Sequence, residues 1–236
     1  LSDMIESPSA PFQPTPSCET LHNGRVVIFT DGACKRYSHK RLRRAGCGAF
    51  WGEGHGMNLS IAVPGRQQSN QRAELLAAIK AAETDPRDLE IRSDSAYVVR
   101  GFNAPSTWRL HSSRVNGDLW RRVDALISMG PSRIHVTKVK GHATWRQVEL
   151  GQVSLIDKTG NAHADRLACM GSDLHASVLQ LEQNSQQRIA QTRQFHRVLL
   201  RIMKARARAL DALPEAVTAP PAQFGNFARN VRRRLQ

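Results

Sequence analysis

Four carboxylates in the sequence have the residue types and positions that metal-dependent chemistry needs. Asp31 and Asp94 each follow a short apolar run, whereas Glu74 and Asp165 lie among helix-forming residues. Carboxylates that face one another repel unless cations neutralise them. Hard divalent cations with oxygen ligands suit such a cluster, so Mg²⁺ is the first candidate and Mn²⁺ the alternative.

A pair of such ions predicts a particular reaction. Two divalent cations about 3.5–4 Å apart activate a water and stabilise the leaving oxygen of an in-line displacement at phosphorus. The ions also reverse the negative sign of the carboxylates, which lets a polyanion approach. A basic surface elsewhere would then hold the phosphate backbone. This combination predicts a nuclease.

The elements that must position these carboxylates follow a mixed α/β order. We predict strands at 26–30, 46–52, 59–63, 89–92 and 134–139. We predict helices at 70–84, 118–129 and 161–170, and a short helix that follows Ser93–Ser95 and ends at about Arg100. The run Val26–Thr30 stops at Asp31-Gly32, which we interpret as a strand that ends in a turn. If the first and fourth strands are parallel neighbours, Asp31 and Asp94 emerge at one carboxyl edge. The predicted fold is α/β, with a five-stranded mixed sheet flanked by helices.

We expect residues 25–172, which contain these strands and helices, to form a catalytic domain. The segments on either side of it differ in composition. Residues 1–24 hold four prolines and no Lys or Arg, which predicts a disordered leader. Residues 173–236 predict a basic helical tail that binds nucleic acid or a partner helix. Its apolar residues recur at helical spacing at Phe195, Val198, Leu199, Ile202, Met203 and Leu210, beside a basic stripe of Arg193, Arg197, Arg201, Lys204 and Arg208. Pro214 should end that helix, and a basic segment, Arg229–Arg234, follows.

Composition narrows the partners. The 236 residues carry 34 Lys and Arg against 20 Asp and Glu, a formal net charge of +14, which favours nucleic acid ahead of a membrane surface. No apolar run is long enough for a membrane span, and the first residues do not have the pattern of a secretory signal. The four cysteines lack metal-binding spacing, so we expect reduced thiols in an intracellular, reducing compartment.

Five short segments carry a family resemblance. They are Thr30–Cys34 (TDGAC), Asn70–Glu74 (NQRAE), Ser93–Ser95 (SDS), Val139–His142 (VKGH) and Asn161–Ala168 (NAHADRLA). In this order they resemble the signature segments of the type 1 ribonuclease H family. Each segment alone is weakly specific, but five in order are strongly specific. The resemblance covers about residues 25–172, and residues 45–74 are most similar to the eukaryotic branch.

The resemblance implies a ribonuclease H-like fold and an endoribonuclease that cuts the RNA strand of RNA/DNA hybrids, leaving 3′-hydroxyl and 5′-phosphate ends. Asp31, Glu74, Asp94 and Asp165 match the family's ligands for two Mg²⁺ ions. In the family's division of ligands, Asp31 and Asp94 serve both ions, Glu74 the second and Asp165 the first. His142 matches a loop histidine that helps product release or proton transfer.

Further positions match substrate-binding residues of the family. Asn70 and Gln71 match residues that contact minor-groove edges and sense the 2′-hydroxyl, which distinguishes RNA from DNA. Ser69, with Arg66 and Asn116, falls where the family binds a phosphate of the DNA strand. Trp108, together with Arg109, is the expected remnant of a DNA-binding channel.

The sequence also departs from the family pattern. Residues 35–39 (KRYSH) replace a segment that often supplies an Asn contact to RNA, and Ala162 replaces a Glu. The spacer between His142 and Asp165 is longer than usual, and we expect its insert, roughly Trp145–Thr159, to enlarge the loop that carries His142.

Three alternative functions remain at this point. The segment is also compatible with the ribonuclease H domain of a retroelement-type polyprotein. A nucleic-acid-binding module that does not cut is disfavoured because all four carboxylates are present. DNA strand transfer is disfavoured by Asn70-Gln71 and by Val139–His142.

Overall fold

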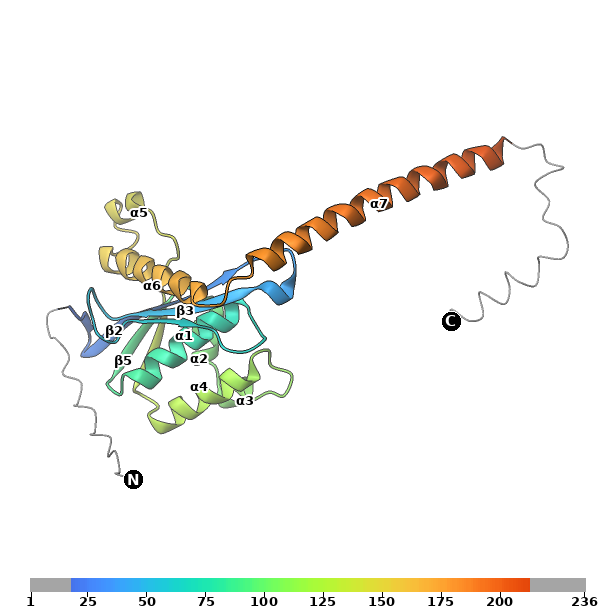
Figure 1. Cartoon of the computed structure of the whole chain (residues 1–236). Coiled ribbons are helices and arrows are strands. Elements are labelled where there is room, and N and C mark those ends of the chain that lie inside the picture. Colours follow the sequence, from blue (N-terminus) through green and yellow to red (C-terminus); the bar gives the residue numbers. More distant parts are fainter. Residues whose placement is uncertain (1–17, 213–236) are drawn as a thin grey trace, which may run out of the picture. The chain divides into compact units, whose positions relative to one another are not determined.

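The computed structural model describes residues 18–212 (Figure 1). Its strands are β1 (Leu21–His22), β2 (Arg25–Lys35), β3 (Arg44–Phe50), β4 (Leu59–Ala62), β5 (Leu89–Ser93) and β6 (Ile134–Lys138). Its helices are the 3₁₀ turn η1 (Lys40–Leu42), α1 (Asn70–Thr84), α2 (Ala96–Phe102), α3 (Ser106–Arg109), α4 (Gly117–Met129), α5 (Trp145–Glu149), α6 (Leu155–Asp173) and α7 (Leu179–Asp211). Most of the predicted disordered leader and the basic segment Arg229–Arg234 lie outside the described residues.

The strands form one mixed sheet in the order β4-β3-β2-β5-β6, and the short β1 pairs with β2. Strands β2, β3 and β4 are antiparallel neighbours, whereas β5 and β6 run parallel to β2. The predicted five-stranded mixed sheet is therefore confirmed, with β1 as a two-residue addition.

Helices cover both faces of this sheet because its central strand is apolar on both. Val26 and Ile28 belong to the core shared with α1, whereas Val27 and Phe29 pack with Ala164 of α6. This alternation follows the two-residue period of a strand. Figure 1 shows the result, with α6 on one side of the sheet and α1, α2 and α4 on the other.

Helix α6 lies very close to β3 because two β3 residues have no side chain. A Cβ atom at Gly46 would lie 2.0 Å from the backbone nitrogen of Ser172, and one at Gly48 would lie 2.4 Å from the carbonyl oxygen of Ala164. This contact fixes the height of α6 over the sheet, and with it the position of Asp165 on that helix.

The folded domain begins before residue 25. Asn23 and Gly24, both with positive φ, form the two-residue turn of the β1–β2 hairpin. Glu19 accepts two hydrogen bonds from Arg87, at 2.9 and 2.7 Å, and pairs with the buried His55 at 2.8 Å. The predicted boundary at residue 24 was therefore too late, because residues 18–24 are held by contacts distant in sequence.

The described part of the C-terminal segment contains the predicted helix, α7. The chain divides into two compact units after Glu182, and α7 crosses that boundary as a helix of 33 residues with no buried side chain. The four cysteines are all free thiols. Among the described helices, none is both long enough and apolar enough to cross a membrane.

Candidate active site

Asp31 and Asp94 are neighbours because of the register between two parallel strands. The last aligned pair of β2 and β5 is Thr30 with Ser93, so each aspartate is the next residue on its strand or loop. The prediction that β2 ends at Asp31-Gly32 was wrong, since β2 continues to Lys35. Residues Asp31–Lys35 of β2 still pair with β3, but no longer with β5, which ends at Ser93. Asp31 therefore lies where β2 loses one of its two neighbouring strands.

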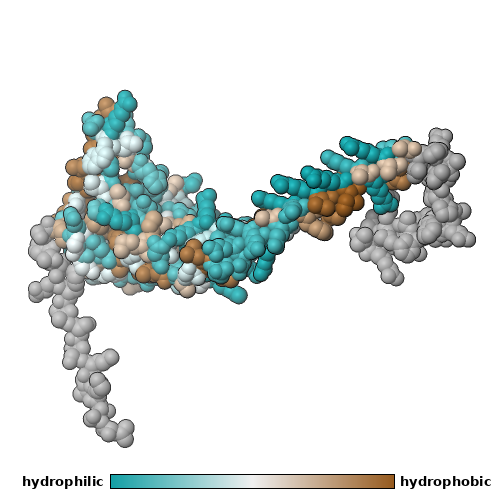
Figure 2. Space-filling model, turned by 45° about the horizontal axis from the view of Figure 1, so that its top comes forward, coloured by the Kyte–Doolittle hydropathy of each residue, from teal (hydrophilic) through white to brown (hydrophobic). Residues whose placement is uncertain are grey.

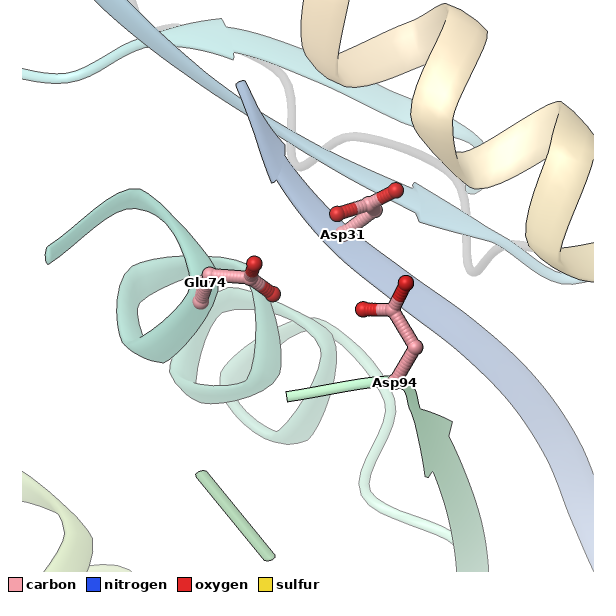
Figure 3. A group of neighbouring side chains, drawn as sticks. All are labelled: Asp31, Glu74 and Asp94. Carbon is pink, nitrogen blue, oxygen red and sulfur yellow. The ribbon is translucent and has the colours of Figure 1, made fainter. Parts of the chain in front are cut away.

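Glu74 reaches the same place from α1. A Cβ atom at Gly32 would lie 2.2 Å from the backbone nitrogen of Glu74, so glycine at this position lets the first turn of α1 rest on β2. One oxygen from each of Asp31, Glu74 and Asp94 lies within 4.8 Å of the others. Figure 3 shows the three carboxyl groups pointing toward one common volume.

Burial and the repulsion between carboxylates favour the neutral forms of Asp31 and Glu74. Burial, together with the charges of Asp94 and Asp165, raises the pKa of Asp31 from 3.8 to about 7. Burial likewise raises the pKa of Glu74 from 4.5 to about 9, together with the charges of Asp31 and Asp94. A divalent cation would compensate this accumulated negative charge.

The donor set fits such a cation. Glu74 Oε2 is buried and has no hydrogen-bond partner among the described residues, while Glu74 Oε1 accepts a hydrogen bond of 2.9 Å from Asn70 Nδ2. The bond from Asn70 fixes the carboxyl group and leaves Oε2 directed to a ligand. Carboxylate oxygens are the preferred donors of Mg²⁺ and Mn²⁺, so Asp31, Glu74 and Asp94 can hold a divalent ion.

Asp165 and His142 lie beside this trio rather than within it. Both line a cavity of about 70 Å³ with Lys158 and Asn161, and Asp165 is close enough for its charge to raise the pKa of Asp31. His142 is exposed and has a positive φ of 49°. The structure therefore brings all five predicted catalytic residues into one neighbourhood, with three carboxylates in direct proximity.

The insert before Asp165 is helical, whereas we expected an enlarged loop. Thr144 caps α5 with a reciprocal capping box to Gln147, and Ser154 caps α6. The ammonium of Lys158 lies 4.2 Å from the centre of the Trp145 ring, which joins the two helices. The insert thus adds ordered structure next to His142.

The contacts of three residues near Asp94, namely Ser95, Lys138 and Gly141, were not predicted from the sequence. Ser95, not Asp94, caps α2, which leaves the Asp94 carboxylate available. A Cβ atom at Gly141 would lie 2.2 Å from Asp94 Oδ2, so this glycine makes room for the carboxylate. Lys138 Nζ donates to the Asp94 carbonyl oxygen at 3.1 Å. The segment Val139–His142 drew attention to Gly141, but nothing in the sequence indicated that Gly141 lies against Asp94.

The residues predicted to bind substrate fall into separate groups. Ser69 caps α1 by accepting from the Arg72 backbone at 3.2 Å, and Arg72 Nη1 donates to Asn116 Oδ1 at 3.4 Å. Arg72 therefore connects Ser69 and Asn116, the two predicted phosphate contacts. The sequence did not predict this role of Arg72. Gln71 is exposed beside them.

The remaining predicted contacts lie elsewhere or are already engaged. Arg66 lines a pocket with Arg41 and Arg44. Trp108 packs edge-on against Trp120, and the Arg114 guanidinium covers its ring at 3.7 Å from the ring centre. The room for the expected substrate contact is thus limited, because the Trp108 ring already packs against Trp120 and Arg114.

Arg109 does not fit the expected DNA channel. It is buried, and its guanidinium donates to Asp124 at 2.8 Å and to backbone carbonyl oxygens. Its charge is paired inside the fold, so Arg109 does not take the expected place beside Trp108 in a DNA-binding channel.

Comparison with known proteins agrees with this geometry. The RNase H family model matches residues 23–173. A ribonuclease H of Schizosaccharomyces pombe is 33% identical over 156 residues, which cover 63% of this chain and 53% of that protein. Ribonuclease H1 of Rattus norvegicus is 32% identical over 160 residues, covering 62% and 50%. The chain thus spans about half the length of these two relatives.

A shorter bacterial relative is covered more fully. Ribonuclease H of Prosthecochloris aestuarii is 33% identical over 130 residues, which cover 50% of this chain and 84% of that protein. The matched region contains the three neighbouring carboxylates, Asp165 and the sheet that positions them. The chain belongs to the ribonuclease H family.

Proposed function

We propose that this chain is a metal-dependent endoribonuclease that hydrolyses the RNA strand of RNA/DNA hybrids. The proximity of Asp31, Glu74 and Asp94 at one sheet edge carries the proposal, because three carboxylates this close need cations to be ionised together. Membership of the ribonuclease H family supports the substrate class. Mg²⁺ is the proposed ion, with Mn²⁺ as the expected substitute.

In the proposed mechanism the chain's own residues organise the metal site. Asp31, Asp94 and Glu74 would hold one ion, and Asp31, Asp94 and Asp165 would hold the other. When bound, the ions supply an activated water and stabilise charge on the leaving 3′-oxygen. Asn70 holds Glu74 in place by its 2.9 Å hydrogen bond. We propose that His142, which is exposed and lines a cavity with Asp165, exchanges a proton with the product phosphate.

Discrimination between RNA and DNA is proposed to come from the start of α1. Asn70 and Gln71 are both exposed there, immediately before the turn that carries Glu74. Their amide groups can donate to and accept from a 2′-hydroxyl and base edges in a wide minor groove. Discrimination therefore takes place within one helical turn of the cleavage site.

A panel of labelled duplexes tests this function. With Mg²⁺, we expect cleavage of the RNA strand of an RNA/DNA hybrid and no comparable cleavage of double-stranded DNA or double-stranded RNA. Equal cleavage of hybrid and double-stranded RNA would contradict the proposed recognition of one RNA and one DNA strand. Binding of the hybrid without any cleavage would instead support a non-cutting module.

Replacing Gly141 by Ala is expected to slow hybrid cleavage about 10- to 100-fold, because a misplacement of about 1 Å at a catalytic group has effects of that size. The new Cβ would lie 2.2 Å from Asp94 Oδ2 and force that carboxylate to move. Thermal unfolding should change little, since a side-chain end can shift. Gly117→Ala is the control, because its Cβ would meet only Arg121 Nη1 at 3.9 Å. A Gly141→Ala protein as active as wild type would contradict this role.

We propose that the basic face of α7 contributes to nucleic-acid binding. At 100° per residue, Arg197, Arg201 and Lys204 lie opposite Phe195 and Ile202, and all of these side chains are exposed. Figure 2 shows the hydrophobic residues gathered along one side of the helix. The polar side is thus free to contact phosphates.

Replacing Arg197, Arg201 and Lys204 together by Gln is expected to weaken hybrid binding. The dependence of log affinity on log salt should become shallower by about two to three units, close to one unit for each phosphate that the variant no longer neutralises. Ile202→Ser, on the other face, serves as the control. An unchanged affinity in the triple variant, with self-association or partner binding abolished by Ile202→Ser, would assign α7 to helix docking instead.

A further inference from the structure

The insert between His142 and Asp165 places a lysine beside the proposed active site. Lys158 lines the small cavity that also contains His142, Asn161 and Asp165. On α6, Lys158, Asn161 and Asp165 follow one another at intervals of three and four residues, so they share one face of this helix. The ammonium-bearing side chain and a proposed metal ligand therefore border the same small volume.

The turn of α6 that carries Lys158 is fixed to the sheet. Arg92 of β5 donates to the Asp157 carboxylate at 2.7 Å. A Cβ atom at Gly160 would lie 2.2 Å from a ring carbon of Phe29, so the helix rests directly on β2. These contacts hold the backbone on both sides of Lys158, which makes this part of the insert a rigid support for the side chain.

The ammonium of Lys158 is oriented by an aromatic ring and not by a carboxylate. It lies 4.2 Å from the centre of the Trp145 ring on α5. An aromatic face attracts a cation without neutralising its charge. Lys35 and Lys80 each form an ion pair with a carboxylate, whereas Lys158 forms none within residues 18–212. The ammonium of Lys158 therefore keeps its charge and its N–H donors for another anion.

Asn161, one turn along α6 from Lys158, has a polar atom that the fold leaves without a partner. The residue is buried, with 4% of its surface exposed, and no described residue donates to its Oδ1. A buried acceptor without a donor is costly, which indicates that a ligand or its water supplies one. A hydrated phosphate group meets both needs of this cavity, because its oxygens accept from the ammonium and its water donates to Oδ1.

We propose that Lys158 binds a phosphate of the cleaved RNA strand at or next to the scissile bond, and that Trp145 positions the ammonium for this contact. The inference rests on the proposed function, in which the strand that lies at Asp165 is the cleaved one. It adds a substrate contact that the insert supplies, outside the carboxylates and His142. An ammonium binds phosphate as a point charge, so the contact raises affinity without reading the sequence.

The test measures hybrid binding by variants of the full chain in an Asp31→Asn background, which keeps the RNA strand intact. Lys158→Gln removes the charge, Lys158→Arg keeps it, and Trp145→Leu removes the ring that orients it. Trp145 is exposed, so its replacement should not unfold the domain. Lys80→Gln is the control, because it removes the same charge from α1 and does not line the cavity. Affinity is measured over a range of salt concentrations, together with thermal unfolding.

We expect Lys158→Gln to bind the hybrid about three- to tenfold more weakly than Lys80→Gln, with a salt dependence shallower by about one unit. The two proteins should unfold at similar temperatures. Lys158→Arg should retain the affinity and salt dependence of the Asp31→Asn parent. Trp145→Leu should bind more weakly than the parent with an unchanged salt dependence, because the charge remains but is no longer held in place.

Neutral groups in the substrate identify the phosphate that Lys158 contacts. Single phosphates of the RNA strand around the cut site are replaced one at a time by methylphosphonates, and each hybrid is compared with one that carries only the same 2′-deoxy sugar. At the contacted position, neutralisation should weaken binding by the parent and leave binding by Lys158→Gln unchanged, since one contact cannot be lost twice. At the other positions both proteins should lose affinity equally.

Equal affinities and salt dependences for Lys158→Gln and Lys80→Gln would overturn the proposal. A weaker Lys158→Gln protein that shows coupling to no single phosphate would also overturn it, because Lys158 would then only support the packing of α5 on α6. Failure of the proposed function is a separate result, namely that the wild-type chain binds hybrid with Mg²⁺ without cutting it.

Discussion

Replacing Asp31 by Asn is expected to reduce hybrid cleavage by about 10³-fold or more, which is about 4 kcal/mol of transition-state stabilisation. An oxygen of Asp31 lies within 4.8 Å of an oxygen of Glu74 and of one of Asp94. The amide keeps the size of the side chain but removes the charge that would hold the cations. Single-turnover cleavage in saturating Mg²⁺ measures the effect.

The folded state should not suffer from this substitution. Burial raises the pKa of Asp31 to about 7, and its charge raises the pKa of Glu74, so the ionised side chain destabilises the metal-free domain. We therefore expect Asp31→Asn to unfold at a higher temperature than wild type at pH 8 without divalent ions. Asp88→Asn, at an exposed position, is the matched control for activity and stability. A less stable Asp31→Asn protein would show that the loss of activity reflects unfolding.

Without divalent cations, the domain is expected to lose stability as the pH rises from about 5 to 9. The folded-state pKa values of Asp31 and Glu74, about 7 and about 9, exceed the ordinary values of 3.8 and 4.5. The folded state therefore binds more protons than the unfolded state in this range, so the free energy of unfolding falls with pH. At about 1.4 kcal/mol per pKa unit, about 2 units from Asp31 and about 4 from Glu74 in this pH range set an upper limit of about 8 kcal/mol for the loss.

Mg²⁺ should reverse this loss at high pH and have little effect near pH 5, where protons occupy the carboxylates. Chemical denaturation at several pH values, with and without Mg²⁺, measures both effects. The double variant Asp31→Asn, Glu74→Gln is the control and should be nearly insensitive to both pH and Mg²⁺ over this range. If the free energy of unfolding depended equally on pH in wild type and in the double variant, Asp31 and Glu74 would not be the cause of the lost stability.

Local sequence patterns were sufficient for the five long strands and for the choice of carboxylates, but not for the short elements β1, α3 and α5. The apolar runs before Asp31 and Asp94 predicted two strands, and the structure places both residues just beyond the aligned pair Thr30 and Ser93. The same local reasoning gave the wrong end for β2. Asp31-Gly32 has the composition of a turn, but pairing with β3, which no local pattern reports, extends the strand to Lys35.

Features that depend on distant side chains could not be predicted in this way. Glu19 looked like part of a proline-rich leader, yet its ion pairs with Arg87 and His55 attach it to the fold. Arg72 is hydrogen-bonded both to Ser69, three residues before it, and to Asn116, 44 residues after it. Such contacts arise from the packing of α1 against its neighbours, and the sequence shows only that polar residues are present.

Cleavage of an RNA/DNA hybrid with an end-labelled RNA strand tests the central claim most directly. We predict that the full chain with Mg²⁺ cuts the RNA strand, leaves 3′-hydroxyl and 5′-phosphate ends, spares the DNA strand, and stops when the divalent ions are chelated. Cleavage that persists after chelation, or RNA fragments that end in a 2′,3′-cyclic phosphate, would contradict this claim, because neither result needs cations held by Asp31, Glu74 and Asp94.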